Sequence, residues 1–273
     1  TISSFKYGDH DLGEMKLLAI STDSSLVLDK INFEKPDLII NASGKWVRNL
    51  SGIDTSDFNI NLHANEFNNM LETFGYDADV IKNGETNIVI DADWNGSPME
   101  FSLDKLNGNL SMQISKGKLL DVNTSASRLF GLLSIQTLPR RLSLDFTDLF
   151  GKGLAFDVIE GNFEIENGNA YTNDLSLKGP SADVSITGRT GLSEQDYDQR
   201  AKVTPKIADS LSVASALFGP IGIGLGAVLY LAGSMFDALH DNINSILMYQ
   251  YTITGSWNEP VIEKFKQSEE NSG

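Results

Sequence analysis

The chain has no cysteine, only three histidines and a shortage of basic residues. Without cysteine it can form neither disulfide bonds nor thiolate metal sites, and it is compatible with an oxidising compartment such as the periplasm. With 21 Lys and Arg against 37 Asp and Glu, its net charge is −16. This balance argues against nucleic acid as a partner, which needs a basic surface, and against electrostatic docking on anionic headgroups. Any membrane contact would therefore have to come from apolar burial.

Motifs for catalysis and metal binding are also lacking. His10, His63 and His240 have no second ligand at a metal-site spacing on one helix face, and no G-x-S-x-G elbow occurs. Residues 91–96 (DADWNG) match the opening of a calcium loop, but the twelfth position, which should be glutamate, is Ser102. We interpret this run as a strand end followed by an Asn-Gly turn. The sequence therefore indicates no enzyme, no cofactor and no metal.

Alternation of apolar and polar residues dominates most of the chain, as at Ile88 and Ile90 or at Leu110 and Met112. Turn signals separate the alternating segments, among them Asn-Gly pairs at 83–84, 107–108 and 167–168. Short strands joined by such turns predict antiparallel hairpins. One apolar side per strand predicts a sheet with one dry face and one wet face.

Three of these strands end near a tryptophan, namely Trp46, Trp94 and Trp257. The first two lie 48 residues apart, a spacing that suits stacked supersecondary units. Tryptophans that cap the ends of separate hairpins explain the pattern equally well, so both interpretations stay open.

Helical spacing is confined to a few segments. Phe67, Met70, Leu71 and Phe74 predict a helix over 64–74 that ends at glycine, and a second helix is expected over 122–135. Apolar helices are expected over 205–248, then a final strand over 249–262 and a disordered polar tail over 263–273.

Residues 210–236 carry no charge. This run is longer than the ~20 residues that span a bilayer, but Gly219-Pro220 divides it and no Lys or Arg flanks it. We therefore predict a helical hairpin over about 211–248 that covers an apolar groove or dips into a membrane surface. The side chains expected to contact a membrane or partner are Leu217, Phe218, Ile221, Ile223, Leu225, Val228, Leu229, Leu231, Met235 and Phe236.

Residues 119–205, which begin LLDVNTSASRLFGLLS, and residues 249–265 (YQYTITGSWNEPVIEKF) resemble the C-terminal region of the AsmA-like, TamB-related family of Gram-negative envelope proteins. The first 118 residues are similar to that family's β repeats. The resemblance implies a protein anchored in the inner membrane by a helix that precedes this chain, which would itself be the segment facing the outer membrane. It also implies a long curved sheet along whose apolar groove acyl chains slide, so that phospholipid passes between the two membranes.

On this basis we predict a mainly β fold with added helices, in which an elongated antiparallel sheet over much of 1–204 forms a U-shaped hydrophobic groove. The partners expected are acyl chains, with little headgroup selection, the rest of the same polypeptide, and the outer membrane or a protein associated with it. An alternative is an envelope docking module that binds an outer-membrane partner through its apolar helices and moves no lipid. The residues expected to line the groove are Ile88, Ile90, Phe101, Leu103, Leu110, Met112, Leu144, Phe163 and Ile165.

Overall fold

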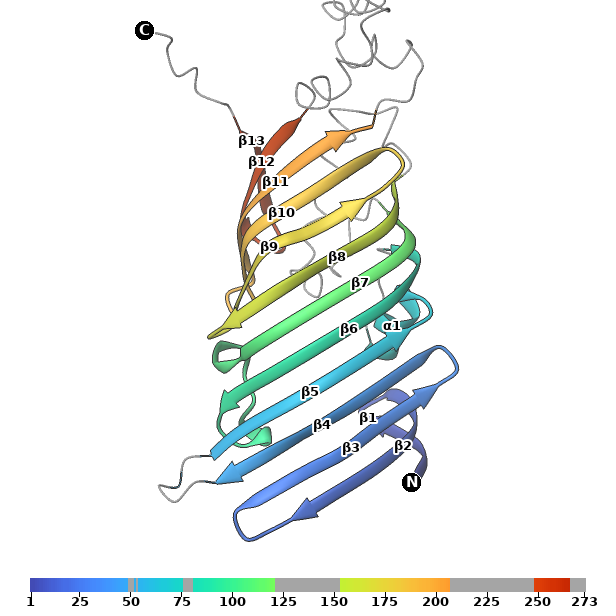
Figure 1. The fold of residues 1–273 in the computed structure, drawn as a ribbon, viewed down its shortest axis with the longest axis vertical. Helices are drawn as coiled ribbons and strands as arrows, with labels where there is room; N and C mark the ends of the chain where they lie inside the picture. Colours follow the sequence, from blue (N-terminus) through green and yellow to red (C-terminus); the bar gives the residue numbers. More distant parts are fainter. Residues whose placement is uncertain (49–51, 53, 76–80, 121–152, 207–247, 266–273) are drawn as a thin grey trace, which may run out of the picture.

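The computed structural model describes residues 1–48, 52, 54–75, 81–120, 153–206 and 248–265. All strands of this described part belong to one antiparallel sheet of thirteen, arranged side by side in chain order (Figure 1). The two outermost strands, β1 and β13, do not pair with each other, so the sheet is open. The strands are β1 (Ile2–Tyr7), β2 (His10–Ser21), β3 (Ser25–Lys35), β4 (Leu38–Arg48), β5 (Asp54–Ala64), β6 (Ile81–Asn95), β7 (Asn107–Leu119), β8 (Leu154–Glu166), β9 (Asn169–Lys178), β10 (Ala182–Gly191), β11 (Asp196–Pro205), β12 (Tyr249–Ser256) and β13 (Pro260–Lys264).

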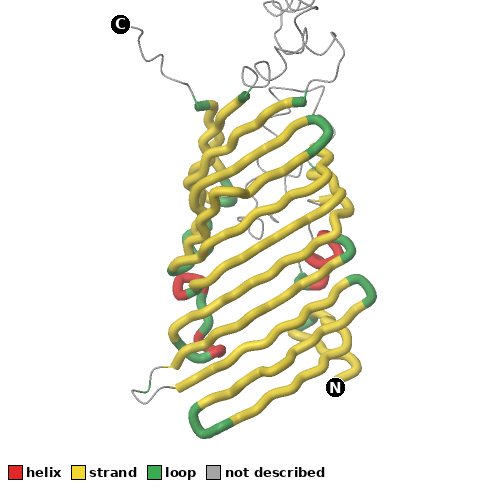
Figure 2. The backbone as a smooth tube through the Cα atoms, viewed as in Figure 1, coloured by secondary structure: helices red, strands yellow, loops and turns green. Residues whose placement is uncertain are grey.

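Helix is scarce in this part of the chain, as Figure 2 shows. A single α-helix, α1 (Phe67–Thr73), lies within the segment for which the sequence predicts one. It ends where Gly75 adopts a φ of 83°, a left-handed conformation that glycine tolerates without steric cost. The helix expected over 122–135, the groove residue expected at Leu144 and residues 207–247 of the expected helical region lie outside the described residues. Pro205, where that region was expected to begin, is the last residue of β11. No helix among the described residues is long and apolar enough to be a candidate for crossing a bilayer.

The sheet is curved, and the strand ends bend away from the viewer in Figure 1, toward the side on which α1 lies. The helix contacts β5 and β6 and also β2. Two particular contacts tie it to the far strands: the Lys35 ammonium donates to the Thr73 hydroxyl over 3.1 Å, and Gly75 lies against the His10 ring. The curvature thus brings strands that are distant in the sheet order to one short helix.

The Asn-Gly pairs take two different conformations. Asn167 and Gly168 form a two-residue hairpin loop between β8 and β9, with φ of 47° and 73°, as a type I′ turn requires. The expectation of a turn is wrong at 83–84 and 107–108, because these residues lie within β6 and β7, and Asn83, Asn107 and Gly108 are paired across the two strands. Asn83, Gly84 and Gly108 have positive φ values, but the chain does not reverse there.

Met99, Phe101 and Leu103 alternate in the sequence as strand residues would, but they do not form a strand. This connection from β6 to β7 contains two 3₁₀ turns, η1 (Pro98–Glu100) and η2 (Leu103–Lys105). Pro98 stands at the first position of η1, and a capping box precedes it, in which the Ser97 N–H donates to the Glu100 carboxylate over 2.8 Å. These two features start a turn where the alternation alone would continue a strand.

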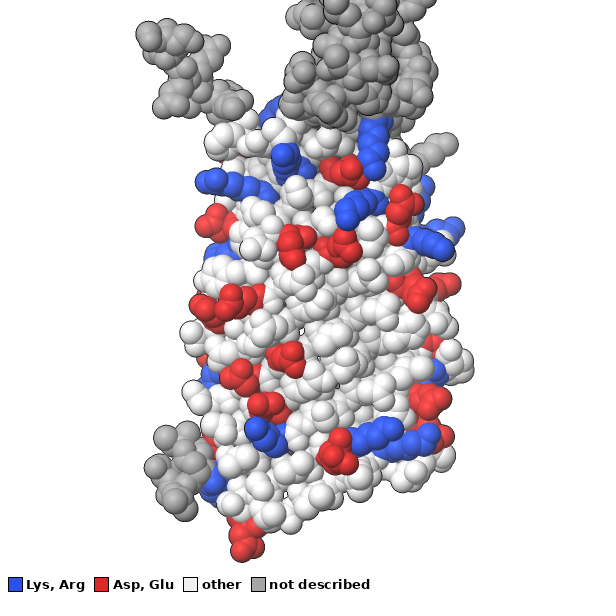
Figure 3. Space-filling view, in the orientation of Figure 1, with Lys and Arg blue, Asp and Glu red and all other residues white. Residues whose placement is uncertain are grey.

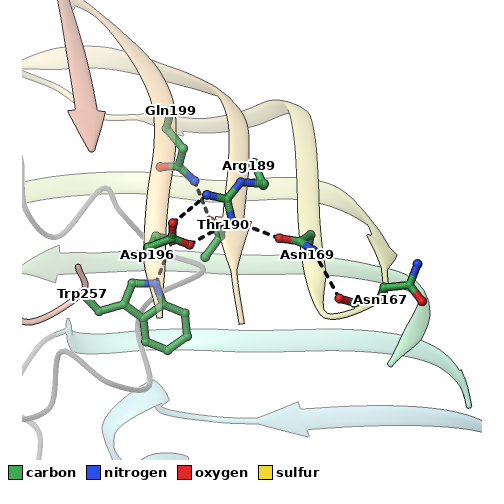
Figure 4. Close-up of polar contacts among 7 residues, drawn as sticks. All are labelled: Asn167, Asn169, Arg189, Thr190, Asp196, Gln199 and Trp257. Atoms are coloured by element: carbon green, nitrogen blue, oxygen red, sulfur yellow. Dashed lines mark hydrogen bonds and ion pairs between the residues drawn. The ribbon is translucent and has the colours of Figure 1, made fainter. Parts of the chain in front are cut away.

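A polar network holds the ends of β9, β10 and β11 together (Figure 4). The Arg189 guanidinium donates to both carboxylate oxygens of Asp196, over 2.9 and 2.7 Å, and to the Asn169 side-chain oxygen over 3.0 Å. The Trp257 indole N–H donates to the Asp196 carbonyl over 3.2 Å. Arg189 holds the pKa of the Asp196 carboxyl below its usual value, chiefly through these hydrogen bonds.

We expect the replacement Gly108→Ala to lower the free energy of unfolding by about 2 kcal/mol or more. Gly108 has a φ of 133°, and an added Cβ would lie 1.9 Å from the Asp91 carbonyl oxygen. The matched control is Gly8→Ala, because Gly8 also has a positive φ but no atom within 4 Å of an added Cβ. Urea unfolding measures both variants, and equal losses would contradict the close-packing argument.

We expect Asp196→Asn to lower the free energy of unfolding by about 1–2 kcal/mol at neutral pH, because a bidentate charged hydrogen bond is lost at a partly exposed site. The folded pKa of Asp196 is depressed, so its contribution is present above the unfolded pKa and is lost as the pH falls through the folded one. The difference between the two proteins should therefore shrink below about pH 4. A difference that is constant from pH 7 to pH 2 would contradict this ionic account.

Candidate functional site

One face of the sheet is apolar from strand to strand, because side chains that are paired in register point to the same side. In one row, Ile40, Leu62, Ile88 and Met112 are successive partners on β4 to β7. In the adjacent row, Ala42, Ile60, Ile90, Leu110 and Phe163 are partners on β4 to β8.

Another row includes the seven strands from β6 to β12. Its members are partners in sequence across six pairings and are apolar except for the first: Thr86, Ile114, Ile159, Leu177, Val184, Val203 and Tyr249. Thr86 satisfies its hydroxyl locally by donating to the Gly84 carbonyl over 2.9 Å. The row therefore carries no charge and offers no polar group in need of a partner.

The apolar face is the concave one. Helix α1 packs on it, since Phe67, Ile81 and Ile114 all lie near Gly84, and α1 lies on the side toward which the strand ends bend (Figure 1). The opposite, convex face is polar: Figure 3 shows Lys, Arg, Asp and Glu scattered over it among uncharged residues. At β2 and β3 the separation is incomplete, because Ile20 and Val27 share the convex side with Lys45 and are exposed.

Burial of the apolar face changes along the sheet. Leu17 on β2 is 49% exposed, and Ile60, Ile88 and Leu110 farther along are half-buried. From β8 to β12 the corresponding side chains are buried, with Ile159 at 0%. Along β2 to β7 the face is therefore accessible only in part, since Ala64 and Ile114 are fully buried there. Along the later strands it is closed.

The register places six of the nine expected groove residues on this face: Ile88, Ile90, Leu110, Met112, Phe163 and Ile165. Phe101 and Leu103 are not on the strands but in the connection from β6 to β7, where they are 49% and 41% exposed. Phe101 packs edge-on against Trp94, with ring centroids 5.1 Å apart. Leu144 and the ten side chains expected to contact a membrane lie outside the described residues.

The most deeply buried part of this face was missing from the expected set, namely the row from Ile114 to Val203 and its neighbours Leu175, Ile186 and Tyr251. The signal for these residues was present, because Leu175, Leu177, Val184 and Ile186 alternate with polar residues in the sequence.

Chemically, the face can only bury apolar groups. Among its buried polar side chains, the Gln199 amide donates to the Thr190 hydroxyl over 2.7 Å (Figure 4). Among the described residues, no group of His, Cys, Asp or Glu is placed to hold a metal ion. The fold and this face together define a class of protein with a single open sheet curved around an uncharged apolar surface.

Comparison with known proteins places the chain within a family. It belongs to the YhdP family, since the family model described as YhdP protein matches residues 1–262. It is 31% identical over 227 residues to the protein named intermembrane phospholipid transporter YhdP of Escherichia coli (strain K12). The match covers 82% of this chain but 17% of that relative, so the chain spans about a sixth of the relative's length. No solved structure matches the chain.

The two faces should respond differently to truncation of an apolar side chain. We expect Ile159→Ala on the concave face to lower the free energy of unfolding by about 2–4 kcal/mol, because it leaves a cavity. Val89→Ala on the convex face, where Val89 is 39% exposed, should cost less than about 1 kcal/mol. Chemical denaturation compares the pair, and similar losses would mean that the concave face is not the core.

Proposed function

We propose that this chain is a segment of a lipid transfer protein of the cell envelope, whose concave face carries phospholipid acyl chains between the inner and outer membranes. The observation that carries the proposal is the uncharged apolar face, which continues in register from strand to strand. The family supports it, because the Escherichia coli relative is named for this activity.

The physical requirement for such transport is a surface that shields hydrocarbon from water without holding it at one point. Each methylene removed from water contributes about 0.8 kcal/mol, so an acyl chain would bind the face. Since the rows repeat the same kinds of side chain on successive strands, the free energy of contact would change little as the chain moves between the accessible strands. The headgroup would stay at the open side in water, which is why we expect little headgroup selection.

The rest of a longer polypeptide is the first partner that we propose. β1 pairs with β2 only as far as Met15, and the following residues 16–21 of β2 are all exposed, with Leu18 at 55% and Ile20 at 59%. An edge with apolar side chains invites a further strand. We propose that preceding parts of the polypeptide extend the sheet and groove here, and that this segment lies in the periplasm at the outer-membrane end.

The second partner is the outer membrane or a protein associated with it, reached through the uncharged residues 210–236. This part of the proposal rests on the sequence, since a long uncharged, apolar segment is unfavourable in water unless it contacts a membrane or another protein surface. A docking module that uses the same residues and moves no lipid would need no open apolar face along β2 to β7, and that face is why we favour transfer.

Photocrosslinking in cells tests the proposal. A benzophenone amino acid at Ile90 or Leu110 in the full-length protein should give adducts with phospholipid, because both positions are on the accessible part of the concave face. The matched controls are Val89 and Asn109, their neighbours on the convex face, which should give little or none.

The same probe at Leu225 separates the two partner classes. Adducts with lipid or with an outer-membrane protein would support contact through the uncharged run. Lipid adducts at neither Ile90 nor Leu110, at normal protein abundance, would refute transfer along this face and leave the docking module. Equal lipid adducts on both faces would show that the contact is nonspecific.

A further inference from the structure

A depression on the convex face lies at an irregularity of β9. Between the pairs Glu160↔Ser176 and Glu164↔Tyr171, three residues of β8 (161–163) lie opposite four of β9 (172–175). The extra residue is a β-bulge, which breaks the ladder locally. The Asp174 carboxylate replaces a backbone acceptor there: it accepts from the Asn162 N–H over 2.8 Å and from the Asn162 side-chain amide over 2.7 Å.

Beside this bulge lies a depression of about 390 Å³ that crosses β6 to β9. A second depression of about 300 Å³ adjoins it and shares Ser111 and Asn162. The larger one has an aromatic wall at Tyr171, which is 43% exposed. Its remaining convex-face lining combines amides, a hydroxyl, carboxylates and one aliphatic side chain: Asn109, Asn162, Asn173, Ser111, Asp91, Glu164 and Val89.

The charges of this lining exclude two classes of ligand. No basic side chain lines the larger depression, and nearby Arg189 is held by Asp196 and Asn169, so an anion such as phosphate would find no counter-charge. The carboxylates do not converge on one point: Asp91 already accepts from the Asn59 amide over 2.7 Å, and no group of acidic residues in the described chain is arranged for a metal ion.

What the lining offers is paired donors and acceptors beside an aromatic ring. Each asparagine amide donates and accepts at once, and Asn109, Asn173 and Ser111 make no side-chain hydrogen bond within the described residues. Adjacent hydroxyl groups on a sugar ring need this combination, and the C–H face of such a ring packs on an aromatic side chain. We propose that this depression is a binding site for a neutral saccharide.

The site is on the opposite face from the apolar rows, so saccharide binding can be tested independently of lipid transfer. Ligand-observed saturation-transfer NMR on the purified protein would test it with maltotetraose, cellotetraose and chitotetraose. At least one should bind saturably. Tyr171→Ala combined with Asn109→Ala should weaken that binding at least tenfold, whereas Tyr171→Phe, which keeps the ring, should change it less than threefold.

Val261→Ala, at a position of β13 that is 48% exposed and distant in the strand order, controls for a general surface effect and should leave binding unchanged. Thermal unfolding checks that each variant is folded, as expected for exposed positions. The proposal is overturned if none of the three saccharides binds saturably. It is equally overturned if the folded double variant binds as tightly as the natural sequence.

Discussion

Register between neighbouring strands is the constraint on which the rest of this structure depends. Side chains alternate between the two faces of a strand, so a slip of one residue would exchange the dry and wet faces. The row from Thr86 to Tyr249 requires six pairings to be in register at once. A single layer of sheet has no second layer to compensate for an error. Every pairing must therefore be in register for the apolar face to continue across all the strands.

Irregularities in the ladder serve this constraint. On β3, Leu28 pairs with Gly44 and Ile31 with Ala42, so one extra residue lies between the two pairs and both side chains stay on the apolar face. The bulge on β9 does the same for Thr172 and Leu175. In each case the two side chains are three residues apart, so strict alternation would place them on opposite faces. The extra residue of the bulge lets both lie on the same face. The convex depression lies beside that bulge.

The sequence was sufficient to predict the antiparallel sheet and the shared face of residues such as Ile88, Ile90 and Leu110, because period-two alternation is a direct consequence of strand geometry. It failed at Phe101 and Leu103, whose alternation is the same but whose backbone follows a capping box. It failed also at Asn83-Gly84, because the left-handed conformation that makes a hairpin turn can equally kink a strand. The curvature of the sheet came only from resemblance, since no local pattern encodes it.

The three tryptophans show how strand ends are secured on such a sheet. Each indole N–H donates to a nearby oxygen: Trp46 to the Asp54 carboxylate, Trp94 to the Ser97 carbonyl, and Trp257 to the Asp196 carbonyl. Trp94 also stacks on Phe58. These contacts close the turns at the strand ends. They favour the interpretation of the tryptophans as caps, because each indole N–H has a local partner and no repeating unit is needed to explain its position.

The change in burial along the concave face bears on how such a surface would handle lipid. From β8 to β12 its side chains already pack to near-zero exposure, so an added acyl chain would gain little there unless those contacts opened. Along β2 to β7 the face is partly exposed to water. An acyl chain that covered it would remove apolar surface of both the lipid and the protein from contact with water. Hydrocarbon would therefore bind first along the earlier strands, and passage beyond them would depend on displacing the contacts that close the later ones.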